Sequence, residues 1–290
     1  MQRIAVVGPG AIGGIVAAWL TQNDNHDVTI CVRSALDRLE VSTSSGILIA
    51  QPRVVFDEAA VAPVDWVIVT TKAYDLAGTC RWLENLVGPV TRVAILQNGV
   101  EHVERFAGSV DRTRIVPVIV DIPAERTAPG RMIQRRDGTM VVARNADGEE
   151  FASLFSHSPI RVSLTDDLKS AAWKKLCLNC AGAVSALVMK PSGIVHRVDI
   201  ADIMRALVLE CIAVGRSQGA DLPDTVVDDV IEALRSSAPD SMNSMLADRI
   251  HNRPIELDAR NGVIVRLGEV GGIPTPMNRL MMALLECAVS

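Results

Sequence analysis

Three glycines near the start of the sequence have the spacing of a phosphate-binding loop. Gly8, Gly10 and Gly13 form the pattern G-x-G-x-x-G, with Ala11 and Ile12 before the third glycine. A short apolar run precedes the loop and a helical pattern follows it, which is the context that dinucleotide binding requires. The first glycine permits the turn, the second lets the backbone approach a pyrophosphate, and the third lets helix and strand pack closely. The sequence therefore predicts a dinucleotide site, with a glycine turn that binds nothing as the weaker alternative.

The end of the second apolar strand bears on which dinucleotide is bound. An NAD site usually places an acidic residue there, to bind the ribose 2′-hydroxyl. Here the strand leads into Arg33, and no acidic residue follows before Asp37. A guanidinium suits bidentate binding of a 2′-phosphate, so Arg33 favours NADP(H) over NAD(H). The alternative is that Arg33 is an ordinary solvated surface residue.

Polar residues also follow two later apolar strands. Lys72 follows one of them and Asn98 follows the next. Because ligands of open α/β sheets bind at the carboxyl ends of the strands, we expect both side chains beside the cofactor. An ammonium and an amide there could bind a carboxylate or a carboxamide, although ordinary loop polarity explains them equally well.

A lysine and an asparagine share one face of a predicted helix in the second half of the chain. Lys175 and Asn179 are four residues apart and are therefore neighbours on the helix surface. A lysine at the edge of a buried stripe can have its pKa lowered and serve as an acid. By itself, the pair Lys174-Lys175 is better explained as two solvated side chains.

Cys177 and Cys180, in the same predicted helix, have redox or metal-binding spacing. A zinc site needs four ligands, and no second pair of Cys or His residues lies near them in the sequence. We therefore expect buried thiols here and no metal site.

The elements that must position these residues change in type near residue 165. Apolar strands are predicted at residues 4–7, 28–32, 66–70 and 93–96, separated by helical stretches. That alternation predicts a parallel sheet with right-handed crossovers. Shorter strands between residues 114 and 163 are expected to form a mixed edge to this sheet.

Helical patterns dominate the rest of the chain. They are predicted at residues 166–189, 199–218, 223–236, 241–250, 256–270 and 275–289. The predicted fold class is thus an α/β Rossmann N-terminal domain that binds NADP(H), residues 1–165, followed by an all-α C-terminal domain, residues 166–290. The apolar stretch 280–289 suits either core packing or a contact between two subunits of a homodimer.

The composition of the 290 residues excludes several classes of protein. Hydrophobic residues make up 49% and charged residues 22%, as in ordinary globular proteins of two domains. The net charge of −5 and an aromatic content of 3% argue against a nucleic-acid partner. No apolar run is long enough to span a membrane, and the first residues lack a signal peptide, so we expect a cytoplasmic protein with a small-molecule substrate.

Eight short motifs occur in order along almost the whole chain. They are Gly8-x-Gly10-x-x-Gly13, Thr71-Lys72-Ala73-Tyr74, Gln97-Asn98-Gly99-Val100, Ala128-Pro129-Gly130, Trp173-Lys174-Lys175-Leu176-x-x-Asn179, Ser244-Met245-Leu246-x-Asp248, Glu256-Leu257-Asp258-x-x-Asn261-Gly262 and Gly272-Ile273-x-Thr275-Pro276. Each motif is weak alone. Together, over residues 4–287, they resemble the ketopantoate reductases (2-dehydropantoate 2-reductases).

The resemblance implies a fold, a reaction and a set of residue roles. The fold is that of 6-phosphogluconate dehydrogenase, with the active site in the cleft between the two domains. The reaction is the NADPH-dependent reduction of a 2-oxo acid to a 2-hydroxy acid, foremost 2-dehydropantoate to pantoate in pantothenate biosynthesis. By position in the motifs, Lys175 matches the general acid and Glu256 a second essential residue.

The remaining matched residues lie around the substrate in the family. Ser244 and Asn179 match residues that bind the substrate, and Lys72 and Asn98 match residues near the nicotinamide and the substrate. All of these roles are expectations that the resemblance carries to this chain, position by position.

The sequence departs from the family pattern at two positions linked to substrate recognition. Ala183 and Ser192 stand where family members commonly have Asn. Losing an amide from a site that hydrogen-bonds the substrate weakens recognition. Two alternatives therefore stay open: a reductase of the same fold with another carbonyl or imine substrate, and a non-catalytic NADP(H) sensor. Retention of Lys175 and Glu256 argues against the sensor, which needs no proton donor.

Overall fold

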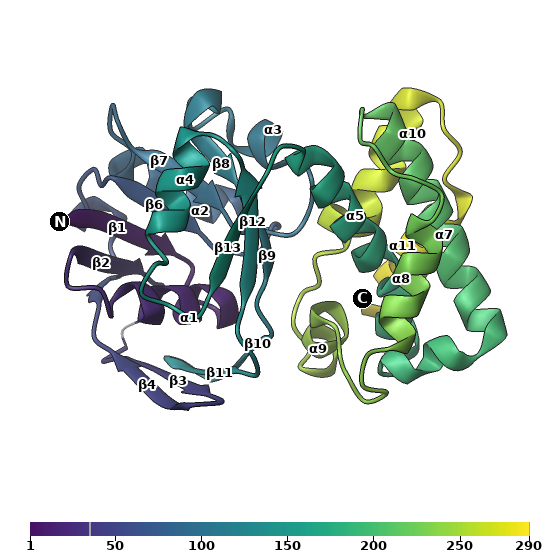
Figure 1. Ribbon diagram of the computed structural model, residues 1–290, viewed down its shortest axis with the longest axis horizontal. Helices are drawn as coiled ribbons and strands as arrows, with labels where there is room; N and C mark the ends of the chain where they lie inside the picture. The colour runs from purple at the N-terminus through teal and green to yellow at the C-terminus, as the bar shows by residue number, and fades with distance from the viewer. Residues whose placement is uncertain (35, 290) are drawn as a thin grey trace. The chain divides into compact units, whose positions relative to one another are not determined.

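The computed structural model describes residues 1–34 and 36–289. The chain divides into two compact units (Figure 1). Unit 1 contains Met1–Gln97 and Glu101–Leu168, and unit 2 contains Asn98–Val100 and the chain from Lys169 onward.

The centre of unit 1 is a six-stranded sheet in which every neighbouring pair of strands is parallel. In spatial order the strands are β5 (Arg53–Val55), β2 (His26–Cys31), β1 (Gln2–Val7), β6 (Trp66–Val69), β7 (Arg92–Ile95) and β8 (Ile115–Pro117). The chain order reverses between β1 and β6, the point at which doubly wound sheets bind ligands. The predicted Rossmann fold of the N-terminal half is confirmed.

The strands of this sheet have apolar central stretches, such as Trp66–Val69, because both of their faces are covered. Ile4 and Val6 of β1 belong to one hydrophobic cluster, together with residues of α1 (Ala11–Leu20). Ala5 and Val7 point the other way, into a second cluster with residues of α2 (Leu76–Leu86) and α3 (His102–Phe106). One face of the sheet is therefore covered by α1 and the other by α2 and α3.

The prediction of a mixed edge to the main sheet is wrong. Of the short strands predicted between residues 114 and 163, only β8 joins that sheet. The other short strands form two further sheets, β10-β11-β3-β4 and β13-β12-β9. Their bounds are β3 (Leu39–Thr43), β4 (Gly46–Ala50), β9 (Ile119–Asp121), β10 (Ala124–Ala128), β11 (Arg131–Gln134), β12 (Thr139–Ala143) and β13 (Arg161–Thr165). The N–H of Val118 still donates to the carbonyl oxygen of Ile95 at 3.0 Å, and the chain leaves the main sheet after it, where β9 pairs antiparallel with β12.

The remaining short helices of unit 1 are η1 (Glu58–Ala60), η2 (Arg112–Arg114) and α4 (Ala146–Ser153). The hairpin of β3 and β4 was not predicted. Its inward residues Leu39 and Val41 are buried, but they alternate with Glu40 and Ser42, so only a period of two marks the strand.

Unit 2 is built from helices once the segment Asn98–Val100 is set aside (Figure 1). They are α5 (Leu168–Ala181), α6 (Ala183–Val188), η3 (Ser192–His196), α7 (Val198–Ser217), α8 (Val226–Arg235), α9 (Ser244–Ile250), η4 (Asp258–Gly262), α10 (Val263–Gly271) and α11 (Pro276–Val289). The single helix expected at residues 166–189 is two helices, α5 and α6. They separate at Gly182, whose carbonyl oxygen accepts a hydrogen bond from Asn243 Nδ2 at 2.9 Å.

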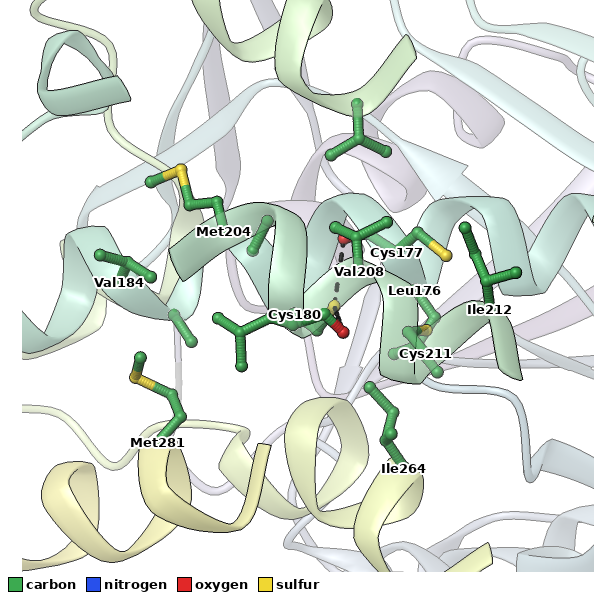
Figure 2. Close-up of a cluster of buried hydrophobic side chains, with 14 of the residues drawn as sticks. Leu176, Cys177, Cys180, Val184, Met204, Val208, Cys211, Ile212, Ile264 and Met281 are labelled. Atoms are coloured by element: carbon green, nitrogen blue, oxygen red, sulfur yellow. Dashed lines mark hydrogen bonds between the residues drawn. The ribbon is translucent and has the colours of Figure 1, made fainter. Parts of the chain in front are cut away.

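The core of unit 2 gathers apolar side chains from α5, α7, α10 and α11 (Figure 2). Cys177 and Cys180 are fully buried in it, and the Cys180 thiol lies 3.2 Å from the carbonyl oxygen of Cys177. The expectation of buried thiols is confirmed. Burial also raises the pKa of the neighbouring Cys211 thiol, which keeps that group in the neutral form that packs well in a core.

Across residues 1–34 and 36–289, no group of three or more His, Cys, Asp or Glu side chains could hold a metal ion. Within the same residues, every helix is too short or too polar to cross a membrane.

Candidate functional site

The glycine loop of unit 1 joins the end of β1 to the start of α1. Gly8 has a φ of +83°, and a Cβ atom there would lie 2.5 Å from Cγ2 of Thr71. Gly10 occupies the N-cap of α1, where it has no side chain to accept from the free N–H groups of the first turn. Such a helix N-terminus is suited to bind an anionic phosphate.

The third glycine allows α1 to lie against the strand-end residue Thr70. A Cβ atom on Gly13 would lie 2.1 Å from Thr70 Oγ1 and 2.8 Å from the carbonyl oxygen of Gly8. The Thr70 hydroxyl lies 3.0 Å from the carbonyl oxygen of Val7 and 2.9 Å from that of Gly8, and its proton fixes the turn. Gly13 is therefore required for packing, whereas the nearest heavy atom to a Cβ on Gly10 is 3.9 Å away.

Arg33 lies beyond β2, with a side chain that is 77% exposed. It forms an ion pair with Asp75, the residue that precedes α2. The guanidinium is thus held within unit 1, near the ends of the parallel strands. Because an exposed ion pair is worth little, a ligand phosphate could compete with Asp75 for it.

The strand-end loops of unit 1 are tied together by buried polar contacts. Strands β1, β6 and β7 end in register, since Val7 pairs with Val69 and Val69 pairs with Ile95. Beyond them, Gln97 Nε2 donates to the carbonyl oxygen of Thr71 at 2.9 Å. The half-buried Lys72 follows Thr71 directly, so this contact fixes the backbone from which Lys72 projects.

His102 supports the same loop from α3. It is 6% exposed, and its Nε2 lies 3.0 Å from the carbonyl oxygen of Gln97. Burial lowers the pKa of His102 from 6.5 to about 4. The neutral imidazole can donate this hydrogen bond from Nε2, so His102 acts here as a structural contact.

The segment Asn98–Val100 packs with unit 2 and places an amide among its polar residues. Gly99 has a φ of +113°, and its missing side chain leaves room for the carbonyl oxygen of Ala259, which would lie 3.2 Å from a Cβ. Asn98 Nδ2 donates to Glu256 Oε2 at 3.1 Å. Asn179 Nδ2 in turn donates to Asn98 Oδ1 at 3.4 Å.

Three residues predicted from the motifs are thus brought together in unit 2. Glu256 is 6% exposed and lies just before the helical run that starts at Leu257, where a carboxylate is favoured by the helix dipole. Lys175, half-buried, lies one turn before Asn179 on α5. The site therefore combines an ammonium, two amides and a buried carboxylate.

Arg260 is a site residue that the sequence reasoning missed. It lies in the π-helical turn η4, is 3% exposed, and its Nη2 donates to Ser244 Oγ at 2.6 Å. Burial lowers the pKa of Arg260, while the nearby carboxylates of Glu256 and Asp248 oppose that shift. The signal in the sequence was an arginine four residues after Glu256, a spacing that puts two residues on one face of a helix.

The two departures from the family pattern, Ala183 and Ser192, are both buried and bring no amide. Ala183 is fully buried. The Ser192 hydroxyl donates to the carbonyl oxygen of Ser241 at 3.0 Å, so its proton is already used inside unit 2.

The parallel sheet, the glycine loop at its switch point and the lysine, amide and carboxylate groups of the helical unit define a class. They are the parts of a dinucleotide-dependent oxidoreductase. Comparison with known proteins gives the family. Residues 4–147 match the family described as "Ketopantoate reductase PanE/ApbA", and residues 167–288 match "Ketopantoate reductase PanE/ApbA C terminal".

Individual relatives agree with these matches. The chain is 56% identical over 288 residues to the 2-dehydropantoate 2-reductase of Caulobacter vibrioides, covering 99% of each chain. It is 36% identical over 287 residues to that of Mycobacterium tuberculosis, covering 98% of this chain and 97% of the relative. The crystal structure of 2-dehydropantoate 2-reductase from Geobacter metallireducens superposes with a TM-score of 0.92, at 28% identity and 99% coverage of both chains.

The protein belongs to the ketopantoate reductase family, and the resemblance found in the sequence motifs is confirmed. Members of this family are oxidoreductases that act on CH–OH groups and use NADPH.

Proposed function

We propose that the protein reduces 2-dehydropantoate to pantoate with NADPH. The observation that carries the proposal is the hydrogen-bonded series Asn179–Asn98–Glu256, in which Asn179 lies on the helix that also bears Lys175. These groups can hold a polar keto acid and supply a proton. Family membership and the 56% identical reductase support the choice of substrate.

The chemistry assigns a separate task to each side chain. NADPH, when bound, supplies the hydride for the keto carbon. The keto oxygen then gains negative charge, and the Lys175 ammonium stabilises that charge and donates the proton. Glu256 would keep Lys175 protonated before turnover, while Asn98 and Asn179 would orient the substrate. The products are the 2-hydroxy acid and oxidised cofactor.

The proposal assigns the cofactor to residues 1–165 and the substrate to residues 166–290 together with Asn98. The open space above Gly10 fits the close approach of a pyrophosphate, and Ala11 and Ile12 would offer N–H groups to it. Lys72 would lie beside the nicotinamide. Arg33 would exchange Asp75 for the 2′-phosphate, which favours NADP(H) over NAD(H).

The proposal extends to a homodimer through α11. Leu280 and Leu284 lie one turn apart on this helix and are 52% and 44% exposed, while Met281 and Leu285 face the core. An apolar strip of this kind suits a contact with a second copy. Light scattering on Leu284→Glu and on the unmodified protein tests it, since a dimer should become a monomer.

The test of the function uses two adjacent lysines. NADPH oxidation with 2-dehydropantoate is measured for the unmodified protein, Lys175→Ala and the control Lys174→Ala, whose side chain is exposed. We expect Lys175→Ala to lower kcat by about 10²–10⁴-fold and Lys174→Ala to leave it unchanged. Equal effects of the two substitutions would refute the role of Lys175.

A second candidate function is reduction of a different 2-oxo acid by the same residues. It is favoured by the buried Ala183 and by the internal hydrogen bond of Ser192, since neither offers an amide to a hydroxylated substrate. NADPH binding without turnover of 2-dehydropantoate, together with turnover of a less hydroxylated 2-oxo acid, would select this function.

A further inference from the structure

Ser244 is the one predicted substrate residue that lies on the surface of unit 2, at the start of α9. A serine hydroxyl has one proton to donate and two lone pairs to accept with. Arg260 Nη2 donates to Ser244 Oγ at 2.6 Å, so one of the lone pairs is occupied. The hydroxyl proton is therefore left to point at an acceptor outside this contact.

Arg260 itself is buried with unused hydrogen-bonding capacity. Its side chain is 3% exposed, and Nε has no hydrogen-bond acceptor among the residues that the structure describes. In the same part of the chain, none of the ion pairs found includes Arg260. A buried guanidinium that is only partly satisfied is costly, so negative charge from a nearby ligand would stabilise it.

The carboxylates nearest to Arg260 in its electrostatic environment are those of Glu256 and Asp248. Glu256 is already engaged by Asn98 Nδ2 at 3.1 Å, and Asp248 by Arg253 Nε at 3.5 Å. Both carboxylates favour the charged form of Arg260, and each has at least one other partner as well. The positive charge of Arg260 is thus maintained within hydrogen-bonding distance of the hydroxyl of the exposed Ser244.

We propose that Arg260 positions Ser244 to bind the carboxylate of the 2-oxo acid and supplies the positive charge that selects an acid over a neutral carbonyl compound. This inference rests on the proposed function and adds the residue that reads the carboxylate end of the substrate. The contact would compensate for the missing amides at Ala183 and Ser192, because recognition moves from the hydroxyl groups of the substrate to its charged end.

The test compares an acid with its uncharged analogue. For each variant, kcat and KM are measured with 2-dehydropantoate and with the corresponding 2-oxo carboxamide. Arg260→Gln should lower kcat/KM for the acid about 30-fold, chiefly by raising KM. The reason is that the charge-assisted contact of Arg260 with Ser244 is lost. The kcat/KM for the 2-oxo carboxamide should change by less than about threefold. Arg260→Lys, which keeps the charge, should recover part of the preference for the acid.

Three controls separate positioning from folding. Arg266→Gln removes a nearby arginine that pairs with the exposed Asp258, and it should leave both substrates unaffected. NADPH affinity and the thermal midpoint report whether Arg260→Gln folds. If it does not fold, kcat/KM for the acid is compared among Ser244→Ala, Arg260→Lys and the double variant. If Arg260 acts by positioning Ser244, the kcat/KM of the double variant is no lower than that of Ser244→Ala. If Arg260 has a purely structural role, the losses of the two single variants multiply in the double variant.

A failure of the inference about Arg260 can be distinguished from a failure of the proposed function. If the unmodified protein reduces no 2-oxo acid, calorimetry with pantoate as the probe replaces kinetics. Weaker binding of pantoate by Arg260→Gln would still uphold the inference. Equal losses for acid and amide, or unchanged pantoate affinity in the folded variant, would overturn it.

Discussion

Replacement of single glycines in the loop after β1 separates the role of packing from the role of cofactor binding. In Gly13→Ala, the added Cβ would lie 2.1 Å from Thr70 Oγ1, so the hydroxyl must leave its contacts with the carbonyl oxygens of Val7 and Gly8. The single hydroxyl proton is shared between the two oxygens, so one hydrogen bond worth about 1 kcal/mol is lost, and overpacking costs about 1–3 kcal/mol. We expect the free energy of unfolding to fall by about 2–4 kcal/mol.

Gly10→Ala should leave the stability nearly unchanged and weaken NADPH binding. A Cβ there meets no heavy atom closer than 3.9 Å, and the φ of −73° is accessible to any residue. The free energy of unfolding should change by less than about 1 kcal/mol. The methyl group would occupy the place where the backbone approaches a pyrophosphate, so NADPH affinity should fall at least tenfold.

Urea denaturation gives the free energies of unfolding, and NADPH fluorescence titration gives the affinities. Gly108→Ala is the control, because that glycine is exposed with nothing within 4 Å of an added Cβ. The reasoning is refuted if Gly10→Ala binds NADPH as tightly as the unmodified protein. It is also refuted if Gly13→Ala is as stable as Gly108→Ala.

Two further predictions concern unit 1. The pKa of His102 lies at about 4 in the folded protein against 6.5 for an unperturbed histidine, so the unfolded chain binds a proton first as the pH falls. The free energy of unfolding should therefore decrease between about pH 6.5 and 4 by up to about 1.4 kcal/mol per pH unit. Urea denaturation at several pH values gives the free energy of unfolding as a function of pH. The slope of that function should be shallower for His102→Gln but not for the exposed His251→Gln. Separately, Arg33→Ala should raise the KM for NADPH about tenfold and leave the KM for NADH nearly unchanged. Equal changes in the two KM values would instead indicate that the Arg33–Asp75 ion pair has a structural role only.

The parallel sheet and its glycine loop could be predicted because local sequence determines both. Continuous apolar strands indicate a sheet covered on both faces, and glycine spacing reflects steric contacts of one short loop. The two smaller sheets were not predictable in the same way. Their strands are short and half-exposed, and β11 pairs with β3 across about ninety residues of chain.

Part of the candidate site could also be predicted from sequence. The motifs indicated Asn98, Asn179 and Glu256, and the hydrogen bonds of unit 2 join all three. That Asn98 packs with unit 2 depends on the positive φ of Gly99, which no periodicity reports. Arg260 was missed because its significance comes from burial and from contact with a serine sixteen residues earlier in the chain.

The central claim is direct transfer of a hydride from NADPH to 2-dehydropantoate. The most direct measurement uses NADPH deuterated at both C4 positions of the nicotinamide and mass spectrometry of the product. The account predicts pantoate that carries a single deuterium on the hydroxyl-bearing carbon, formed in equal amount to oxidised cofactor. Pantoate without deuterium, or NADPH that stays reduced while bound beside 2-dehydropantoate, would contradict the account.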